Sequence, residues 1–321
     1  MKRRAFLAAA AALAAARPAI SQEWVPTLPI RMVVPYPPGG TTDVLGRMVA
    51  EGMSERLGRQ VVVDNRSGAS GIIGTEWVRN AAPDGHTLVF VSSGHGVLRE
   101  LYPNLPFDPN DDFTPVARIA GTAYALVAHP ILEVTDIAGL IALAKARPGA
   151  ISFASTGMGT AQHLAGELFK RLAGIDIVHI PYRGSGTVRA DLMTGRVPVM
   201  FENLALMAPV LQRGELRGLA VTSEGRSPLV PAIPTMAESG FPEATIEGWF
   251  GLLGPKGMPA PVVAALNAAA NATLESPAAR QRMAGLGARM MGGTPRQLDE
   301  LIRTERARWG AVIRDANIRP E

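Results

Sequence analysis

The sequence of 321 residues contains no cysteine. A disulfide scaffold, a zinc or iron–sulfur site with cysteine ligands and a cysteine nucleophile are therefore excluded. Charged residues are also scarce, at 19%, whereas hydrophobic residues make up 47%. This composition and length indicate a globular protein with a substantial core and room for two domains.

Motifs of several common enzyme classes are missing as well. The nucleophile elbow Gly-x-Ser-x-Gly, the phosphate loop and the dinucleotide fingerprint Gly-x-Gly-x-x-Gly do not occur. The five histidines lack the paired spacing of a zinc site. We therefore expect a binding protein with no catalytic residue, no metal and no cofactor. A secreted α/β hydrolase is the enzymatic alternative, and the missing elbow weighs against it.

The N-terminus has the composition of an export signal. Met1 to Arg4 is basic, Ala5 to Ala16 is apolar but too short to span a bilayer, and Ala19 to Ser21 offers small residues for cleavage. We assign residues 1–21 to a signal peptide. The pair Arg3-Arg4 also resembles the twin-arginine motif, so the ordinary secretory route and the twin-arginine route both remain open.

Cleavage of this signal changes the charge of the protein. The formal charge of +4 falls to zero, because Lys2, Arg3, Arg4 and Arg17 are lost and no acidic residue is lost with them. A neutral mature chain has no bulk charge with which to attract nucleic acid. We expect no nucleic-acid partner, no later membrane span and a location outside the cytoplasm.

A glycine-rich loop follows the first apolar run of the mature chain. Ile30 to Val34 predicts a buried strand, and a helical pattern begins near Val44. A strand, a loop and a helix N-terminus in this order present unpaired N–H groups and a partial positive charge to an anion. The alternative is an ordinary turn with Thr42 or Asp43 as N-cap. The candidate anion-binding residues of this loop are Pro38, Gly39, Gly40, Thr41, Thr42 and Asp43.

The same unit recurs along the chain. Apolar runs at residues 61–63, 87–91, 151–154, 177–180 and 197–201 predict strands, and small polar residues follow them. Ligands of parallel sheets bind outside the carboxyl ends of the strands. The candidate residues at these ends include Ser93, His163 and Arg183, and the Arg183 guanidinium could donate to a carboxylate. Alternatively, His163 is a partly exposed surface histidine and Arg183 forms an exposed ion pair.

Several of these motifs together resemble Bug-type receptors, the periplasmic solute-binding proteins of tripartite tricarboxylate transporters. The resemblance rests on Pro35 to Gly40 with Asp43, Asp64 to Gly71, Pro83 to Leu88, Ser155 to Thr160 with His163, and Pro181 to Gly184. It extends from about Pro29 to the C-terminus, with the motifs in the order of the family.

The resemblance implies a two-lobed α/β fold of the type II periplasmic-binding-protein kind, with a mostly parallel sheet flanked by helices in each lobe. Lobe 1 would comprise residues 22–121 and 228–321, and lobe 2 residues 122–227, with a first crossing near Gly121. The ligand would be a small carboxylate (a di- or tricarboxylate, an amino acid or an aromatic acid) held between the lobes. Phosphate or sulfate remains an alternative ligand.

Together, the motifs and the resemblance give one set of candidate ligand-binding residues. They are Pro38, Gly39, Gly40, Thr41, Thr42, Asp43, Gly68, Ala69, Ser70, Gly71, Ser93, Ser155, Thr156, Gly159, Thr160, His163, Arg183, Gly184, Ser185, Glu202 and Asn203. The pair Glu202-Asn203 departs from an aspartate found at this position in many members. Either Glu202 faces the cleft, where it shortens the pocket or selects an amine, or Asn203 takes its place.

The resemblance also implies the partners. The receptor would be a monomer that delivers its ligand to the membrane permease subunits of a tripartite tricarboxylate transporter. In the alternative, the same pocket serves a periplasmic receptor whose partner is a signalling protein.

Overall fold

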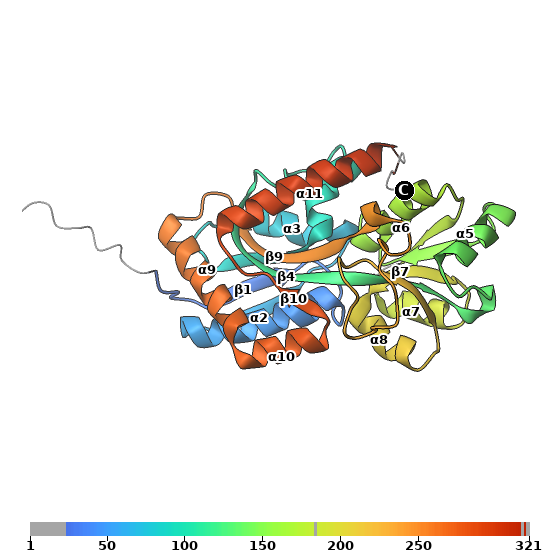
Figure 1. The fold of residues 1–321 in the computed structure, drawn as a ribbon. Coiled ribbons are helices and arrows are strands. Elements are labelled where there is room, and N and C mark those ends of the chain that lie inside the picture. Colours follow the sequence, from blue (N-terminus) through green and yellow to red (C-terminus); the bar gives the residue numbers. More distant parts are fainter. Residues whose placement is uncertain (1–23, 183–184, 316–317, 319–321) are drawn as a thin grey trace, which may run out of the picture.

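The computed structural model describes residues 24–182, 185–315 and 318. Strands and helices alternate along most of this part of the chain (Figure 1). The strands are β1 (Ile30–Val34), β2 (Val61–Asn65), β3 (Thr87–Ser92), β4 (Phe113–Ala128), β5 (Ser152–Ser155), β6 (Val178–Pro181), β7 (Val199–Asn203), β8 (Arg217–Val221), β9 (Glu247–Pro255) and β10 (Ala288–Met290). The helices are α2 (Thr41–Leu57), α3 (Ile72–Arg79), α4 (Leu98–Leu101), α5 (Ile137–Ala146), α6 (Ala161–Ala173), α7 (Ser185–Met193), α8 (Leu204–Gln212), α9 (Ala260–Glu275), α10 (Pro277–Gly285) and α11 (Pro295–Asp315), with 3-10 turns η1 (Ala69–Gly71), η2 (Ser93–Val97), η3 (Pro130–Leu132) and η4 (Pro242–Ala244).

The strands form one sheet that belongs to two lobes. Its order is β2-β1-β3-β9-β4-β7-β5-β6, and β8 and β10 both pair with β4. Strands β2, β1 and β3 are parallel at one end, and β7, β5 and β6 are parallel at the other. Helices α2, α3, α9 and α10 lie with the first group, and α5 to α8 lie with the second (Figure 1). The predicted two-lobed α/β fold is confirmed.

Strand β4 passes from the first lobe to the second. Its residues from Phe113 to Ala123 pair with β9, whereas Tyr124 to Ala128 pair with β7. The change of partner therefore falls between Ala123 and Tyr124, two positions beyond the predicted crossing near Gly121. Because a continuous strand makes this crossing, its backbone hydrogen bonds are satisfied on both sides of the change.

The return of the chain to the first lobe differs from the prediction at residue 228. Val230 packs in a core of the second lobe, Thr235 bridges to Val221 of β8, and Ile246 lies in a second-lobe core. The chain joins the first-lobe sheet only with β9, from Glu247. Residues 227–234 are rich in proline and have the composition of a linker, but their apolar side chains pack with those of β8.

Helix α11 packs against both lobes. Leu298 and Ile302, in its first half, belong to a core with residues of β1, β3 and β9. Trp309 and Ile313, in its second half, belong to the core of the second lobe. Figure 1 shows the helix running along the top of the molecule from one lobe towards the other. It is thus a third connection between the lobes, beside β4 and β9.

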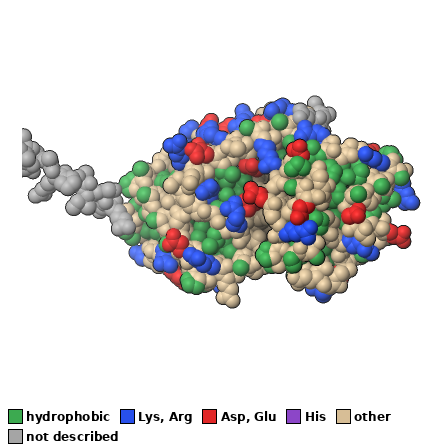
Figure 2. Space-filling view, in the orientation of Figure 1, with side chains coloured by type: hydrophobic (Ala, Val, Ile, Leu, Met, Phe, Trp, Pro, Cys, Tyr) green, Lys and Arg blue, Asp and Glu red, His purple; other side chains and the backbone are tan. Residues whose placement is uncertain are grey.

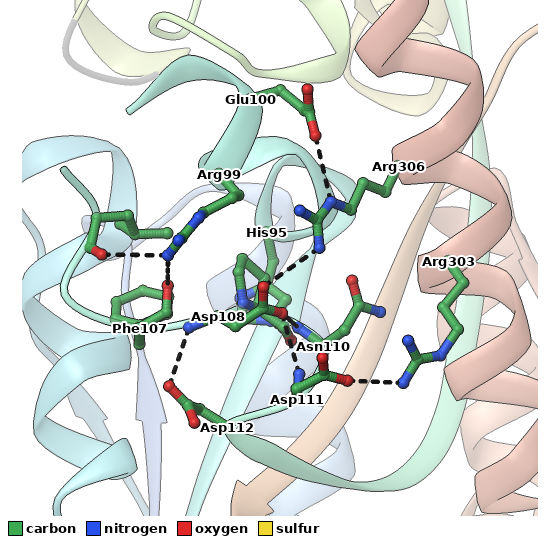
Figure 3. A network of polar contacts seen from close by, with 12 residues as sticks. His95, Arg99, Glu100, Phe107, Asp108, Asn110, Asp111, Asp112, Arg303 and Arg306 are labelled. Carbon is green, nitrogen blue, oxygen red and sulfur yellow. Dashed lines mark hydrogen bonds and ion pairs between the residues drawn. The ribbon is translucent and has the colours of Figure 1, made fainter. Parts of the chain in front are cut away.

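Charged side chains of α11 also hold the loop that follows α4 (Figure 3). Arg306 contacts Glu100 and Asp108, each at 3.3 Å, and Arg303 contacts Asp111 at 2.9 Å. Asp108 also accepts a hydrogen bond from the N–H of Asn110. Because this loop precedes β4, these contacts fix the start of the strand that leads into the crossing.

The described helices include none that is both long and apolar enough to cross a membrane. Figure 2 shows Lys and Arg side chains interspersed with Asp and Glu side chains over the visible face. The described basic residues on this face form no continuous patch of the kind that binds a phosphate backbone.

Candidate functional site

A cavity of about 1030 Å³ lies between the lobes. Its wall comes from the carboxyl ends of β1, β2 and β3 in the first lobe and of β5, β6 and β7 in the second. Open α/β sheets bind ligands at these ends. The predicted residues that line the cavity are Pro38, Gly39, Gly40, Thr41, Thr42, Gly68, Ala69, Ser70, Gly71, Ser93, Thr156, Gly159, Thr160 and Asn203.

The loop after β1 presents the N-terminus of α2 to the cavity. The N-cap is Gly40, which has no side chain to cap the helix, so neither Thr42 nor Asp43 is the N-cap. The first N–H groups of a helix have no partner within it, and the helix dipole adds a partial positive charge there. This end of α2 is therefore suited to a ligand oxygen that carries negative charge.

Asp43 supports this loop from behind and does not line the cavity. Asp43 is buried, and its carboxylate accepts hydrogen bonds from the N–H of Gly39 at 2.9 Å, from Arg47 at 3.1 Å and from the Asn65 amide at 2.9 Å. Burial raises the pKa of Asp43, but these bonds outweigh it, and the pKa lies below its ordinary value. Asp43 therefore stays ionised and positions the loop.

The loop after β2 has an unusual backbone. Gly68, Ala69, Ser70 and Gly71 all have positive φ, at 140°, 45°, 55° and 92°. For Ala69 and Ser70 this conformation costs on the order of 1–3 kcal/mol each, and such strain concentrates at ligand sites. The turn places the Ser70 hydroxyl 2.9 Å from the Tyr102 hydroxyl and 3.4 Å from the carbonyl of Met158 in the other lobe.

The loop after β5 is held by its own side chains. Thr160 caps α6 by accepting from the N–H of His163, and its hydroxyl donates to the carbonyl of Gly157 at 2.7 Å. His163 Nδ1 accepts from the N–H of Gly159 at 3.1 Å. His163 is 2% exposed and lies behind the loop, so it is neither a surface histidine nor a residue of the cavity wall.

A second histidine stacks on His163. The centroids of the His163 and His179 imidazole rings lie 3.9 Å apart, and the angle between the ring planes is 19°. His179 Nε2 lies 2.7 Å from the hydroxyl of Ser155, which is fully buried and also lies off the wall. Burial, the neighbouring His179 and Lys170 lower the pKa of His163 to about 3, and burial and Lys170 lower that of His179 to about 4. Both rings are therefore neutral at pH 7.

The structure distinguishes Glu202 from Asn203. Asn203 lines the cavity, and its side-chain oxygen caps α8 by accepting from the N–H of Ala205 at 3.0 Å. Glu202 is 2% exposed and lies off the wall, where its Oε1 accepts from the N–H of Asn203 and from the Gln162 amide. Of the two alternatives, Asn203 is the one at the cavity, and Glu202 positions it.

The loop after β6 is only partly described. Arg183 and Gly184 lie outside the described residues. Ser185 begins α7, and its backbone alone is described. Their predicted role in ligand binding stays a prediction.

The aromatic part of the wall was not predicted from the sequence. Tyr36, Tyr102, Tyr124, Tyr182 and Phe250 all line the cavity. Tyr36 and Tyr182 lie in two of the motifs described above, each within two residues of a strand end. This position beside a strand end could have indicated that they line the cavity. Tyr124 and Phe250 lie within strands, where nothing in the local pattern indicates a binding role. The other wall residues that were not predicted include Ser67, Ser92, Gly94, Gln162 and Thr187.

The described wall contains no charged side chain. Its polar groups are hydroxyls, two amides (Gln162 and Asn203) and the backbone of glycine-rich loops. Such groups hold an anion through oriented N–H and O–H dipoles without a fixed countercharge.

Replacing Gly248 with alanine tests the position of Tyr124. Gly248 lies on β9 beside the crossing, and a methyl group there would overlap the Tyr124 hydroxyl. We expect a loss of about 1–3 kcal/mol in unfolding free energy, as for other overpacked sites, and weaker ligand binding. Urea unfolding measures the first effect. Gly225→Ala is the control, because a methyl group at Gly225 meets nothing within 4 Å; equal stability of the two variants would contradict the expectation.

Comparison with known proteins gives the family. A family model described as "Tripartite tricarboxylate transporter family receptor" matches residues 45–318. Protein BugT of Bordetella pertussis is 40% identical over 298 residues, covering 92% of this chain and 91% of that protein. An R. palustris protein solved with adipate is 38% identical, with a TM-score of 0.86 over 92% of this chain and 99% of that one. MatC from Rhodopseudomonas palustris, solved with bound malate, is 32% identical, with a TM-score of 0.84 over 90% and 99%. The chain therefore belongs to the tripartite tricarboxylate transporter family of receptors, as its resemblance to Bug-type receptors predicts.

Proposed function

We propose that this protein is a periplasmic receptor that binds a small carboxylate between its lobes and delivers it to the permease subunits of a tripartite tricarboxylate transporter. One observation carries the proposal: a cavity whose described wall has no charged side chain and is surrounded by glycine-rich loops at the carboxyl ends of strands from both lobes. The related structures with adipate and with malate support the ligand class.

The uncharged side chains of the described wall suit a receptor that must release its ligand. Hydrogen bonds from N–H and O–H groups compensate a carboxylate for the water it leaves, and bridging waters add little free-energy cost. A buried ion pair with an arginine would add a specific countercharge, and its separation would slow release. We propose that the ligand leaves unchanged, since the described wall lacks the histidine or carboxylate that general acid–base catalysis most often uses.

Lobe closure is the proposed signal to the permease. The lobes already approach each other closely across the cavity, since a Cβ atom at Gly94 would lie 3.3 Å from the carbonyl of Gly159. A ligand that contacts the loop at Gly94 in the first lobe and the loop at Gly159 in the second stabilises the form in which the lobes are close together. The stabilisation equals the difference between its binding free energies to the closed and open forms. Small-angle scattering of ligand-free and ligand-bound protein measures the effect, and an unchanged radius of gyration would count against it.

A thermal-shift screen of the mature protein tests the ligand class. The panel contains mono-, di- and tricarboxylates, amino acids, phosphate and sulfate, and the protein is first unfolded and refolded to remove bound ligand. A carboxylate at a hundredfold excess over Kd is expected to stabilise the protein by about 2.7 kcal/mol. A shift with phosphate or sulfate and with no carboxylate would refute the proposed ligand class.

A further inference from the structure

The cavity wall contains every tyrosine of the chain. The sequence has only four tyrosines, and aromatic residues make up 5% of it. Yet Tyr36, Tyr102, Tyr124 and Tyr182 all line the cavity, together with Phe250. They come from both lobes and from the crossing strands β4 and β9. In a chain so poor in aromatic residues, this concentration at one site calls for a physical role.

Protein groups already engage the hydroxyls of three of these tyrosines. The Ser92 hydroxyl donates to that of Tyr36 at 3.0 Å. The Tyr102 hydroxyl lies 2.9 Å from that of Ser70. The Tyr182 hydroxyl donates to the Asp191 carboxylate at 2.6 Å. Because the polar end of each residue is tied in this way, it contributes mainly ring carbon to the cavity, and its ring is fixed in orientation.

The fourth tyrosine is the most buried of the group. Tyr124 is 5% exposed. Burial and the nearby Glu202 raise its pKa, and burial also raises the pKa of Tyr36. Burial and the bond to Asp191 raise the pKa of Tyr182 to about 12. These three hydroxyls therefore stay protonated, and the aromatic wall carries no charge that would repel an acid.

The wall thus combines two kinds of surface. Backbone N–H groups and hydroxyls of the glycine-rich loops suit a carboxylate, and the aromatic rings suit a flat apolar body. Leu98 and Met158 extend the apolar part of the wall. An open-chain acid would bury its carbon against these rings too, but a planar ring gains in addition the edge and stacking contacts between aromatic groups.

We propose that the ligand of this protein is an aromatic carboxylate, whose ring packs among these tyrosines and Phe250 while its carboxylate binds the glycine-rich loops. This inference rests on the proposed function, and it narrows the ligand class from small carboxylates to those with a planar ring.

Matched pairs of acids test the inference by isothermal titration calorimetry. Benzoate is compared with cyclohexanecarboxylate, and phenylacetate with cyclohexylacetate, because the members of each pair have the same carbon skeleton and carboxylate, and only one member has a planar aromatic ring. Adipate and malate are titrated beside them. We expect the aromatic member of at least one pair to bind about threefold to tenfold more tightly than its saturated partner and than both open-chain acids.

The outcomes separate this inference from the proposed function. If the saturated ring, adipate or malate binds as tightly as the aromatic acids, the aromatic inference is overturned and the carboxylate receptor stands. If no carboxylate binds, both the aromatic inference and the proposed function are overturned. Binding of an aromatic acid should also perturb tyrosine absorbance in the wild-type protein, and an unchanged difference spectrum would refute ring packing.

A pair of variants at Tyr102 separates the ring from its hydroxyl. Tyr102→Phe keeps the ring and removes the bond to Ser70, and Tyr102→Leu removes the ring. We expect Tyr102→Phe to keep the preference for the aromatic member of the pair, and Tyr102→Leu to lose about threefold of it. The ratio within a pair is the readout, because a change in stability affects both acids alike. An unchanged ratio in Tyr102→Leu would exclude Tyr102 from the proposed aromatic wall.

Discussion

Replacing Asp43 with alanine is expected to lower the unfolding free energy by about 2–4 kcal/mol and to weaken ligand binding at least tenfold. The carboxylate is buried and accepts hydrogen bonds from the N–H of Gly39 and from the side chains of Arg47 and Asn65. Each buried donor left without an acceptor costs about 1–3 kcal/mol. The loop that presents the N-terminus of α2 would also lose its support. Urea unfolding and calorimetric titration with the best ligand of the screen measure the two effects.

A matched pair of aspartates controls this experiment. Asp43 and Asp299 each pair with an arginine four residues later, but the Asp299 carboxylate is 33% exposed and that of Asp43 is 5% exposed. Asp43→Asn and Asp299→Asn make the same chemical change at a buried and at a more exposed carboxylate, and Asp299→Asn should cost less than about 1 kcal/mol. Asp43→Asn should cost more, because its amide would face the amide group of Asn65. Equal losses in the two variants would show that Asp43 is not a structural support of the loop.

Acidification is expected to destabilise the protein between about pH 6.5 and pH 4 through the stacked pair His163 and His179. Their pKa values are lowered from 6.5 to about 3 and about 4 in the folded protein. Over this range the unfolded chain binds protons that the folded protein excludes, so stability falls as pH falls, by at most about 1.4 kcal/mol per pH unit for each ring. Well above pH 6.5 both states hold neutral rings, and the pair adds no pH dependence. His95, whose pKa burial lowers to about 4, acts in the same direction.

The variant His163→Asn isolates one member of the pair. An asparagine oxygen can replace Nδ1 as the acceptor for the N–H of Gly159, and it does not titrate. Urea unfolding at several pH values between 7 and 4 should give a slope lower than in the wild-type protein, with the difference rising to at most about 1.4 kcal/mol per pH unit well below pH 6.5. A variant with the wild-type slope would exclude His163 as a source of the pH dependence. Ligand affinity should not change through His163 over the same range, because the ring stays neutral in the folded protein until the pH approaches its lowered pKa of about 3.

Recurrent local patterns made much of the site predictable. Short apolar runs followed by glycine, serine and threonine mark strand ends, and parallel strand ends meet at one edge of a sheet. The predicted residues at Gly39 to Thr42, Gly68 to Gly71 and Thr156 to Thr160 accordingly share one cavity. For these residues the position in the chain decides the position in space, because the loops are short and the strands beside them are paired.

Residues that act from behind the wall were not predictable in this way. Asp43, Ser155, His163 and Glu202 stand in the same motifs as the wall residues, but their side chains point into the protein, where they hold N–H or hydroxyl groups. Burial decides between these two roles, and burial depends on neighbours from other elements, such as His179 on β6 and Asn65 on β2. The return to the first lobe at Glu247 was missed for the same reason, since contacts of the second lobe hold the preceding loop.

The sequence by itself determined that strands alternate with helices and end in polar, glycine-rich loops, because hydrophobic periodicity and turn residues act locally. The two-lobed arrangement was implied by the resemblance to a known family. The absence of cysteine and of the common enzyme motifs is likewise visible in the sequence alone. Only the tertiary structure decided which groups face the cavity. It gathers four tyrosines from positions 36, 102, 124 and 182 around one cavity, and it places Asn203 at the wall with Glu202 behind it. Side-chain direction at a strand end follows from packing across the sheet and between the lobes, and those contacts join residues far apart in the chain.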